Sequence, residues 1–197
     1  LTESQRPTHC SSATSNRTLL IMPDFNFLTT HVGSVPHPTA NGLTDNQYKL
    51  LDVPAWPQLP RRSFRESMYA QYSPALPALC VDEVQEKVYF DTNQDLTGLL
   101  EVFYTATLSD DVESFALRPD YANGFYAMLE ALRSTTGEWA KGQVTGPVSF
   151  GLTVTDQGLR ASLYNEVLAD AIIKNMAMNA RWQIRQLKSV RPNVIMF

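Results

Sequence analysis

The sequence predicts an α/β protein in which a parallel sheet is covered by helices on both faces. Segments with the patterns of strands and helices alternate along the 197 residues. The last of these segments, residues 193–197, is almost wholly apolar and follows a long helical pattern. A near-continuous apolar strand next to helical segments is typical of a parallel sheet that is buried on both sides. Functional sites in such folds lie at the carboxyl ends of the strands.

Composition argues against several classes of function. The chain carries 20 acidic and 16 basic residues, a net charge of −4, whereas nucleic-acid binders usually present a basic face. We therefore expect no nucleic-acid partner. No apolar run approaches the ~18 residues that a membrane span requires. We expect no membrane segment and place the protein in the cytoplasm. The two cysteines, Cys10 and Cys80, are too few for a disulfide scaffold or a cysteine-rich zinc module.

Residues 1–21 show no hydrophobic period and are rich in Ser, Thr and Arg. They lack the basic start and the long apolar centre of a secretory signal, although a transit peptide remains an alternative. We expect a disordered tail or upstream translation, with Met22 as the true start. The chain begins at Leu1 and ends in an apolar strand without a polar cap, so we also expect it to be a fragment of a longer protein.

The first half of the patterned region predicts extended segments, one short helix and one hairpin. Residues 25–35 have the pattern of a strand, which ends where the following prolines cannot continue a ladder. Residues 44–51 can form a short helix. Three prolines within residues 53–62 leave only a short strand or an extended loop. Residues 78–91 predict a hairpin with a polar turn.

The second half predicts three helices and two strands. Apolar residues recur at helical spacing within residues 96–103 and again within residues 121–132. Residues 144–150 are expected to form a strand that runs into a loop. Residues 165–189 carry the longest helical stripe, which an Arg-Pro pair ends before the final strand, residues 193–197.

The first predicted strand ends in residues 30–37, where a Gly-Ser turn is flanked by two histidines. The backbone N–H groups of Gly33 and Ser34, together with the Ser34 hydroxyl, could hold a carboxylate or a similar anion. An ordinary strand-to-loop turn is an equally open alternative. His31 and His37 could bind a metal. Because the motif has no nearby Cys or carboxylate, we favour hydrogen-bonding loop histidines.

The second and third strand ends carry further candidate groups. Arg61 and Arg62 follow a proline-stiffened segment that includes Gln58, and two guanidinium groups could clamp a carboxylate with bidentate geometry. A solvent-facing side chain is the alternative for at least one of them. Residues 145–147 form a shaped loop with hydroxyl groups nearby, but the Gly-Lys-Ser/Thr end of a phosphate-binding loop is absent. Spacing alone identifies no catalytic residue.

Three of these segments carry a resemblance to a known family. They are His-Val-Gly-Ser with the following Pro-His, Trp-Pro-Gln-Leu-Pro-Arg-Arg at residues 56–62, and Gly-Gln-Val-Thr-Gly-Pro-Val-Ser at residues 142–149. Together they resemble the cobalamin-independent methionine synthase-like proteins, in the superfamily shared with uroporphyrinogen decarboxylase. Methionine synthases carry a similar Leu-Thr-Gly-Pro-Val-Thr at the third barrel strand, which makes this match the most specific. The resemblance extends over residues 22–197.

The resemblance implies a TIM (β/α)8 barrel of the uroporphyrinogen decarboxylase/methionine synthase type. Residues 22–197 would form its N-terminal half, because a whole barrel takes at least about 250 residues. The first four strands would lie near residues 27–33, 55–60, 143–149 and 193–197, with the hairpin as an insertion before the third.

The resemblance also implies a methyltransferase of methionine biosynthesis. In this family zinc lowers the pKa of a substrate thiol such as homocysteine, and the thiolate attacks a methyl group carried by a folate or corrinoid. Gly33 and Ser34 would hold the amino-acid part of the substrate, and His31 and His37 would line the same mouth. The residues that would shape the pocket floor, without a chemical step, are Thr145, Gly146 and Pro147.

The family's zinc ligands, a His-x-Cys pair with later acidic and Cys residues, have no counterpart here, and its Asp-Glu-Pro motif is also absent. We expect both beyond Phe197, so these 197 residues alone are expected to be inactive. One alternative is a uroporphyrinogen-decarboxylase-like lyase without a metal, in which Arg61 and Arg62 bind tetrapyrrole carboxylates. Another is an accessory barrel that binds a folate or corrinoid, with a corrinoid protein as partner.

Overall fold

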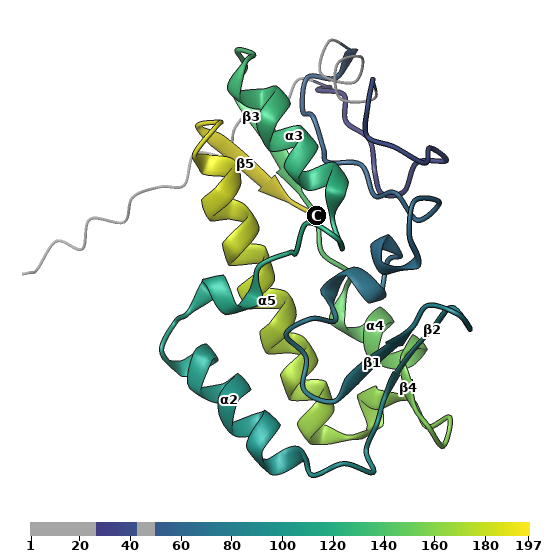
Figure 1. The fold of residues 1–197 in the computed structure, drawn as a ribbon. Coiled ribbons are helices and arrows are strands. Elements are labelled where there is room, and N and C mark those ends of the chain that lie inside the picture. Colours follow the sequence, from purple (N-terminus) through teal and green to yellow (C-terminus); the bar gives the residue numbers. More distant parts are fainter. Residues whose placement is uncertain (1–26, 43–49) are drawn as a thin grey trace, which may run out of the picture.

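The computed structural model describes residues 27–42 and 50–197 (Figure 1). The predicted tail over residues 1–21 lies outside the described residues. So does most of the predicted helix over residues 44–51. None of the helices in the described part of the chain is long and apolar enough to cross a membrane.

Four extended segments lie side by side in parallel, in the order in which they occur in the sequence. A bridge between Ser34 and Gln58 joins the first two, and a bridge between Ala55 and Lys141 joins the second to the third. A parallel ladder of four residue pairs joins the third to the fourth. The strands of this ladder are β3 (Trp139–Gly142) and β5 (Asn193–Met196). The carboxyl ends of all four segments therefore point to the same side.

Four α-helices accompany these segments in the described residues. They are α2 (Leu96–Leu108), α3 (Asn123–Arg133), α4 (Pro147–Thr153) and α5 (Glu166–Lys188). The longest, α5, runs through the middle of the molecule (Figure 1). The Asn165 side chain starts it by accepting hydrogen bonds from the backbone N–H groups of Val167 and Leu168. The helices predicted over residues 96–103, 121–132 and 165–189 are therefore confirmed.

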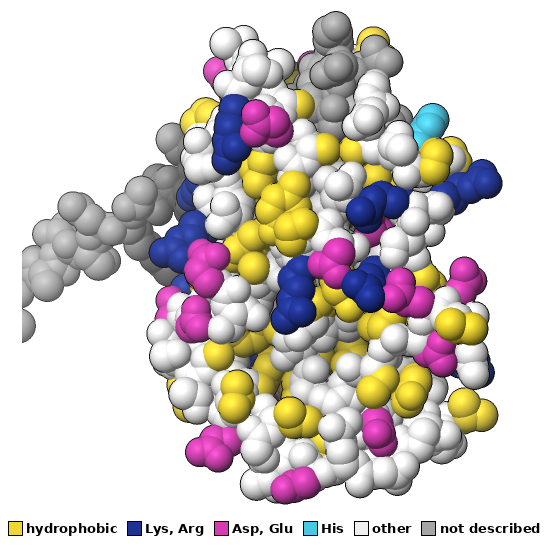
Figure 2. All heavy atoms as spheres, viewed as in Figure 1, with side chains coloured by type: hydrophobic (Ala, Val, Ile, Leu, Met, Phe, Trp, Pro, Cys, Tyr) yellow, Lys and Arg dark blue, Asp and Glu magenta, His cyan; other side chains and the backbone are white. Residues whose placement is uncertain are grey.

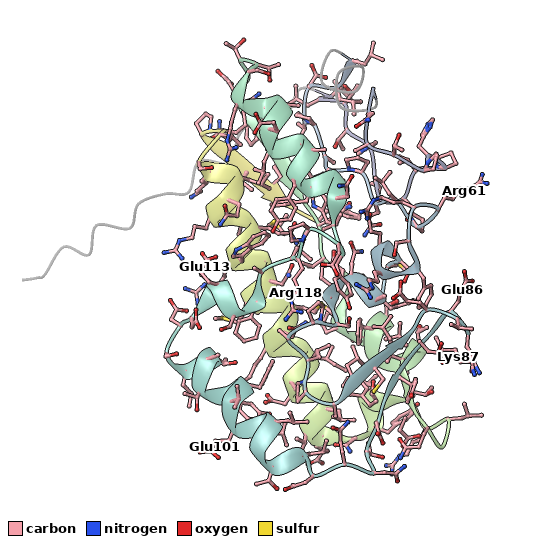
Figure 3. The ribbon with its side chains drawn as sticks, in the orientation of Figure 1. Arg61, Glu86, Lys87, Glu101, Glu113 and Arg118 are labelled. Carbon is pink, nitrogen blue, oxygen red and sulfur yellow. The ribbon has the colours of Figure 1, made fainter. Side chains whose placement is uncertain are left out.

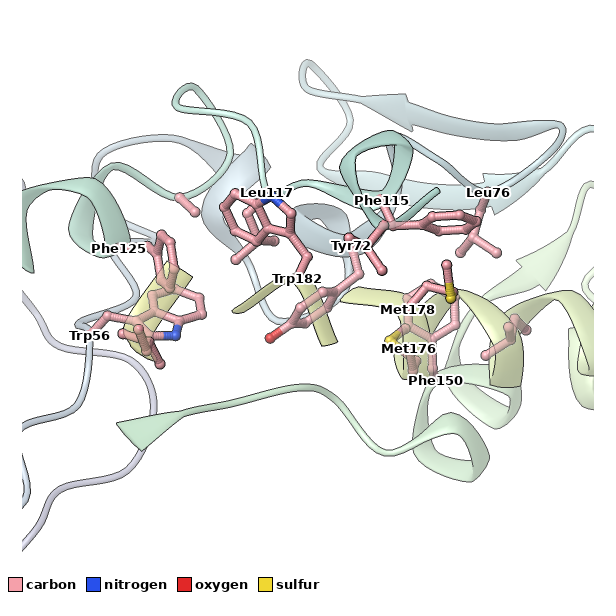
Figure 4. Close-up of a cluster of buried hydrophobic side chains, with 14 of the residues drawn as sticks. Trp56, Tyr72, Leu76, Phe115, Leu117, Phe125, Phe150, Met176, Met178 and Trp182 are labelled. Carbon is pink, nitrogen blue, oxygen red and sulfur yellow. The ribbon is translucent and has the colours of Figure 1, made fainter. Parts of the chain in front are cut away.

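Aromatic side chains pack α3 and α5 against the second extended segment (Figure 4). The Trp56 ring meets Phe125 of α3 edge-on, with 5.9 Å between the ring centroids. Phe125 in turn lies 5.1 Å from Trp182 of α5. Both helices thus pack on the face from which Trp56 projects, whereas the sequence predicts helices on both faces of the sheet.

A second sheet, of three short strands, lies at the other end of α5 (Figure 1). Its strands are β1 (Leu79–Asp82), β2 (Lys87–Phe90) and β4 (Thr155–Asp156), in the order β1-β2-β4. β1 and β2 are antiparallel and confirm the predicted hairpin. Short 3-10 helices complete the chain: η1 (Phe64–Glu66), η2 (Ala70–Tyr72), η3 (Val112–Phe115) and η4 (Ser162–Tyr164).

The predicted strand over residues 144–150 is wrong. β3 ends at Gly142, and Pro147 is the first residue of α4. Proline suits that position because its missing N–H would have no partner in the first turn and its φ is already helical. The first predicted strand forms no ladder in the described residues, where Ser34 alone makes a bridge. The described residues form two open sheets and no closed barrel.

Two helix glycines give a matched test of this packing. A Cβ on Gly124 would lie 1.9 Å from the carbonyl oxygen of Pro57, which is backbone and cannot move aside. We expect Gly124→Ala to lower the free energy of unfolding by roughly 1–3 kcal/mol. Gly98 of α2 has open space around it, so Gly98→Ala should raise that free energy by about 0.5–1 kcal/mol. Urea denaturation measures both, and equal effects would contradict the close approach of α3 to the second segment.

Candidate functional site

The bridge between the first two segments brings three of the predicted site residues together. The Ser34 hydroxyl donates to the side-chain carbonyl oxygen of Gln58 at 3.3 Å. Gly33 adopts a left-handed φ of +76°, and its N–H donates to Oε1 of Gln143, also at 3.3 Å. The predicted free donors of the turn are thus partly occupied, by two long hydrogen bonds. Such bonds can exchange for a ligand at low cost.

Gln143, which the sequence analysis does not select, joins three of the parallel segments. Its Nε2 donates to the carbonyl oxygen of Trp56 at 3.2 Å, while its Oε1 receives the Gly33 N–H. Its backbone carbonyl oxygen accepts a hydrogen bond from the Tyr72 hydroxyl at 2.8 Å. A buried amide with both ends satisfied holds the Gly-Ser turn at a defined distance from β3.

Gln183 of α5 supports Gln143 from the helix side. Its Oε1 accepts hydrogen bonds from the Gln143 backbone N–H and from the Trp56 indole N–H, both at 3.1 Å. Its Nε2 donates to the Gln143 carbonyl oxygen at 2.8 Å and to Oδ1 of Asn179 at 2.7 Å. Gln183, Asn179 and Asn175 are buried on the stripe of α5 whose other buried residues are apolar. Polar residues on such a stripe are the signal by which the sequence could have revealed this network.

Thr145 and the residues after it take structural positions at the same end of the segments. The Thr145 hydroxyl donates to the carbonyl oxygen of Met68 at 2.7 Å and so ties the chain before η2 to the end of β3. Gly146 precedes the first turn of α4, and Pro147 begins it. A Cβ on Gly146 would meet open space. These three residues therefore shape the surroundings of the site.

The two predicted arginines do not converge on this site. Arg62 forms an ion pair with the buried carboxylate of Glu66, with Nη1 and Oε1 2.5 Å apart. Burial raises the pKa of Glu66, and the charge of Arg62 opposes that shift. The Arg61 side chain is exposed and extends away from the body of the molecule (Figure 3). Among the described residues, Arg62 already has its counter-ion.

The two predicted histidines lie in different environments. His37 is exposed, whereas both ring nitrogens of His31 are buried and have no hydrogen-bond partner within the described residues. Lys141 reaches His31 from β3, and its ammonium donates to the His31 carbonyl oxygen at 2.8 Å. Burial first, and then the positive charge of Lys141, lower the pKa of the His31 imidazole. His31 is therefore neutral near pH 7.

The described residues do not form a metal site. No three His, Cys, Asp or Glu side chains of the described part lie close enough together to hold an ion. Cys80 is a half-buried free thiol on β1, remote in the fold from the Gly-Ser turn. The zinc ligands that the family resemblance implies are expected beyond Phe197, and the described residues do not test that expectation.

A cavity of about 680 Å³ lies elsewhere, between the hairpin, η1 and the turn after β4. Its lining includes Phe64, Tyr69, Tyr89 and Leu159 but none of the predicted site residues. On the face shown in Figure 2, acidic and basic side chains are interspersed and form no continuous basic surface. Because the cavity contains none of the predicted site residues, the candidate site is the polar network at the ends of the parallel segments.

Comparison with known proteins found no matching family model, no matching curated protein and no matching solved structure.

The polar network predicts a large effect of Gln183→Leu. The variant would leave the Trp56 indole N–H and the Gln143 backbone N–H buried without acceptors. Each such orphan costs about 1–3 kcal/mol, so we expect the free energy of unfolding to fall by roughly 2–5 kcal/mol. Gln186→Leu, on a half-buried position of the same helix, is the control and should change it by no more than about 0.5 kcal/mol. Denaturant unfolding of both variants is the measurement.

The lowered pKa of His31 predicts a pH dependence of stability. The unfolded chain, with an imidazole pKa near 6.5, binds more protons than the folded chain, so the free energy of unfolding should fall as the pH drops below about 6.5. Above that pH the contribution is constant. In thermal melts, His31→Gln should flatten the dependence of stability on pH just below pH 6.5. The control, His37→Gln at an exposed position, should leave that dependence unchanged. An unchanged slope in His31→Gln would show that the imidazole is not buried as described.

Proposed function

We propose that this chain forms the N-terminal, substrate-binding half of a TIM-barrel methyltransferase that resembles cobalamin-independent methionine synthase. The reaction would move a methyl group from a folate or corrinoid donor to a small thiol such as homocysteine, in the cytoplasm. The net charge of −4 supports a small-molecule substrate over a nucleic acid.

One observation carries the proposal. The four extended segments are parallel and follow one another in chain order, as the first four strands of such a barrel would. This order places the Gly33-Ser34 turn, Gln58 and the end of β3 at one side. In a barrel that side is where substrates bind. The helix-flanked, parallel order thus supports the resemblance that the three sequence segments suggest.

The chain's own groups suit the amino-acid part of a thiol substrate. The Ser34 hydroxyl and the Gln58 amide can each both donate and accept hydrogen bonds, and the left-handed turn at Gly33 lets a ligand approach the backbone closely. A bound zinc ion would activate the thiol, and its ligands would have to come from residues other than those described. The described residues bind and orient the substrate.

The structure gives less support to the alternatives. A uroporphyrinogen-decarboxylase-like lyase would use Arg61 and Arg62 for tetrapyrrole carboxylates, yet Arg62 is paired with Glu66 and the exposed Arg61 side chain extends away from the body of the molecule. An accessory barrel that serves a corrinoid protein would share the parallel order but would have no need of a thiol substrate. Substrate binding therefore separates it from the enzyme.

Two glycines with the same left-handed φ test the proposal. Gly33 and Gly42 both have φ = +76°, so an added Cβ strains each backbone similarly. Only Gly33 lies at the proposed site. We expect L-homocysteine to bind the wild type and Gly42→Ala alike, and Gly33→Ala at least about tenfold more weakly, in isothermal titration calorimetry.

Absence of homocysteine binding to the wild type, or equal binding to both glycine variants, would overturn the proposed function. Methyl transfer itself is measured as methionine formed by the complete gene product, with a methylated folate or methylcobalamin as donor and zinc added.

A further inference from the structure

Lys141 brings an ammonium group into the interior of the chain. The residue is only 3% exposed, and it lies on β3 beside the second extended segment. Its Nζ donates to the His31 carbonyl oxygen at 2.8 Å and lies 4.7 Å from the centre of the Phe197 ring. His31, Lys141 and Phe197 therefore meet at one place, although they come from the first, third and fourth segments.

The charge of Lys141 has no counter-ion in the described part of the chain. No carboxylate there lies within ion-pair distance of its Nζ, in contrast to Lys174, which pairs with Asp170. A backbone carbonyl and an aromatic face each attract an ammonium, but neither supplies a negative charge. An ammonium has three N–H donors, and the His31 carbonyl takes one of them. Burying such a group without an anion is costly, so the geometry calls for one.

The imidazole of His31 also lacks hydrogen-bond partners. Both ring nitrogens of His31 are shielded from solvent without a partner in the described residues. A neutral imidazole always carries one N–H donor, and burying that donor without an acceptor is unfavourable. Hence an ammonium with only one hydrogen-bond acceptor and an imidazole with none come from neighbouring positions next to the Gly33-Ser34 turn.

We propose that the Lys141 ammonium and the His31 imidazole bind the carboxylate of a small organic acid. The two oxygens of one carboxylate can accept from both side chains at once, and its charge compensates that of Lys141. This inference rests on the proposed function, because it makes the substrate's carboxylate the group that reaches below the turn. Burial also lowers the pKa of Lys141, because it makes the charged form less favourable. A bound anion would offset that cost.

The Phe197 side chain lies where a ligand would reach the Lys141 ammonium. Its ring covers the ammonium, yet the residue is 69% exposed, so the ring can move aside without giving up buried packing. Because Phe197 contributes an exposed ring rather than a backbone segment, movement of that side chain uncovers the side of the ammonium that the ring faces. Side chains change rotamer on a fast timescale compared with ligand binding.

The test compares butyrate with butyramide, which has nearly the same shape but no charge. Saturation-transfer NMR on the full chain should show butyrate binding at least about tenfold tighter than butyramide. Lys141→Met keeps most of the length of the side chain, removes its charge and should lose that preference, while Lys141→Arg should retain most of it. The control is Lys87→Met, which removes the same charge from an exposed position on the hairpin (Figure 3). It should bind as the wild type does.

The outcomes separate this inference from the proposed function. Equal binding of butyrate and butyramide to the wild type, or an unaltered preference in Lys141→Met, would overturn the carboxylate site even if the protein methylates homocysteine. A preference that depends on Lys141, without any homocysteine binding, would keep the site and overturn the function. If Lys141→Met does not fold, the ¹⁵N signals of the His31 imidazole decide. Butyrate must shift them and butyramide must not.

Discussion

The interaction on which the rest of the structure depends is the pair of buried amides, Gln143 and Gln183. In a regular parallel ladder, the Gln143 N–H would continue the pairing of β3 with the second segment. Here that N–H goes to Gln183 of α5, and the Gln143 side chain bonds the Trp56 carbonyl oxygen in its place. The exchange gives these groups partners while the backbone separates from the second segment. The Val144 N–H still donates to the Phe197 carbonyl oxygen, and the chain turns into α4 at Pro147.

The same exchange arranges the candidate site in two levels. At the rim, the Ser34 hydroxyl donates to Gln58 and the Gly33 N–H donates to Gln143, both over 3.3 Å, long enough to be traded for a ligand. Beneath them, Lys141 carries a charge that no described side chain compensates. Neutral groups at a rim can select the shape of a substrate, whereas a buried charge supplies strength, because electrostatic interactions grow as water is excluded.

Local patterns in the sequence predict the elements that pack on themselves or on an obvious apolar stripe. α5 follows from the helical spacing of its buried residues, whereas the hairpin and β5 follow from short apolar runs next to turn-forming residues. The same reasoning fails at residues 144–150, where apolar spacing suits a strand but the proline favours the start of a helix. In α2, periodicity predicts the helix correctly, yet Leu99 on its apolar stripe remains 41% exposed. A pattern shows which face is apolar and does not show what covers that face.

The site depends on contacts between residues far apart in the chain. The sequence therefore predicts the site less completely than it predicts the helices and the hairpin. The ion pair of Arg62 with Glu66 could have been predicted from their spacing of four residues. This pair means that Arg62 is not a free cation for the site. The contact of Lys141 with His31 joins residues 110 positions apart, so no local window contains it. Residue type alone gives the wrong expectation for both cations. Arg62 carries a charge that suits an anionic substrate but is already paired, whereas Lys141 lies within β3, where no site residue is expected. What decides the role of each cation is whether the fold leaves it a counter-ion, and that is a property of the assembled segments.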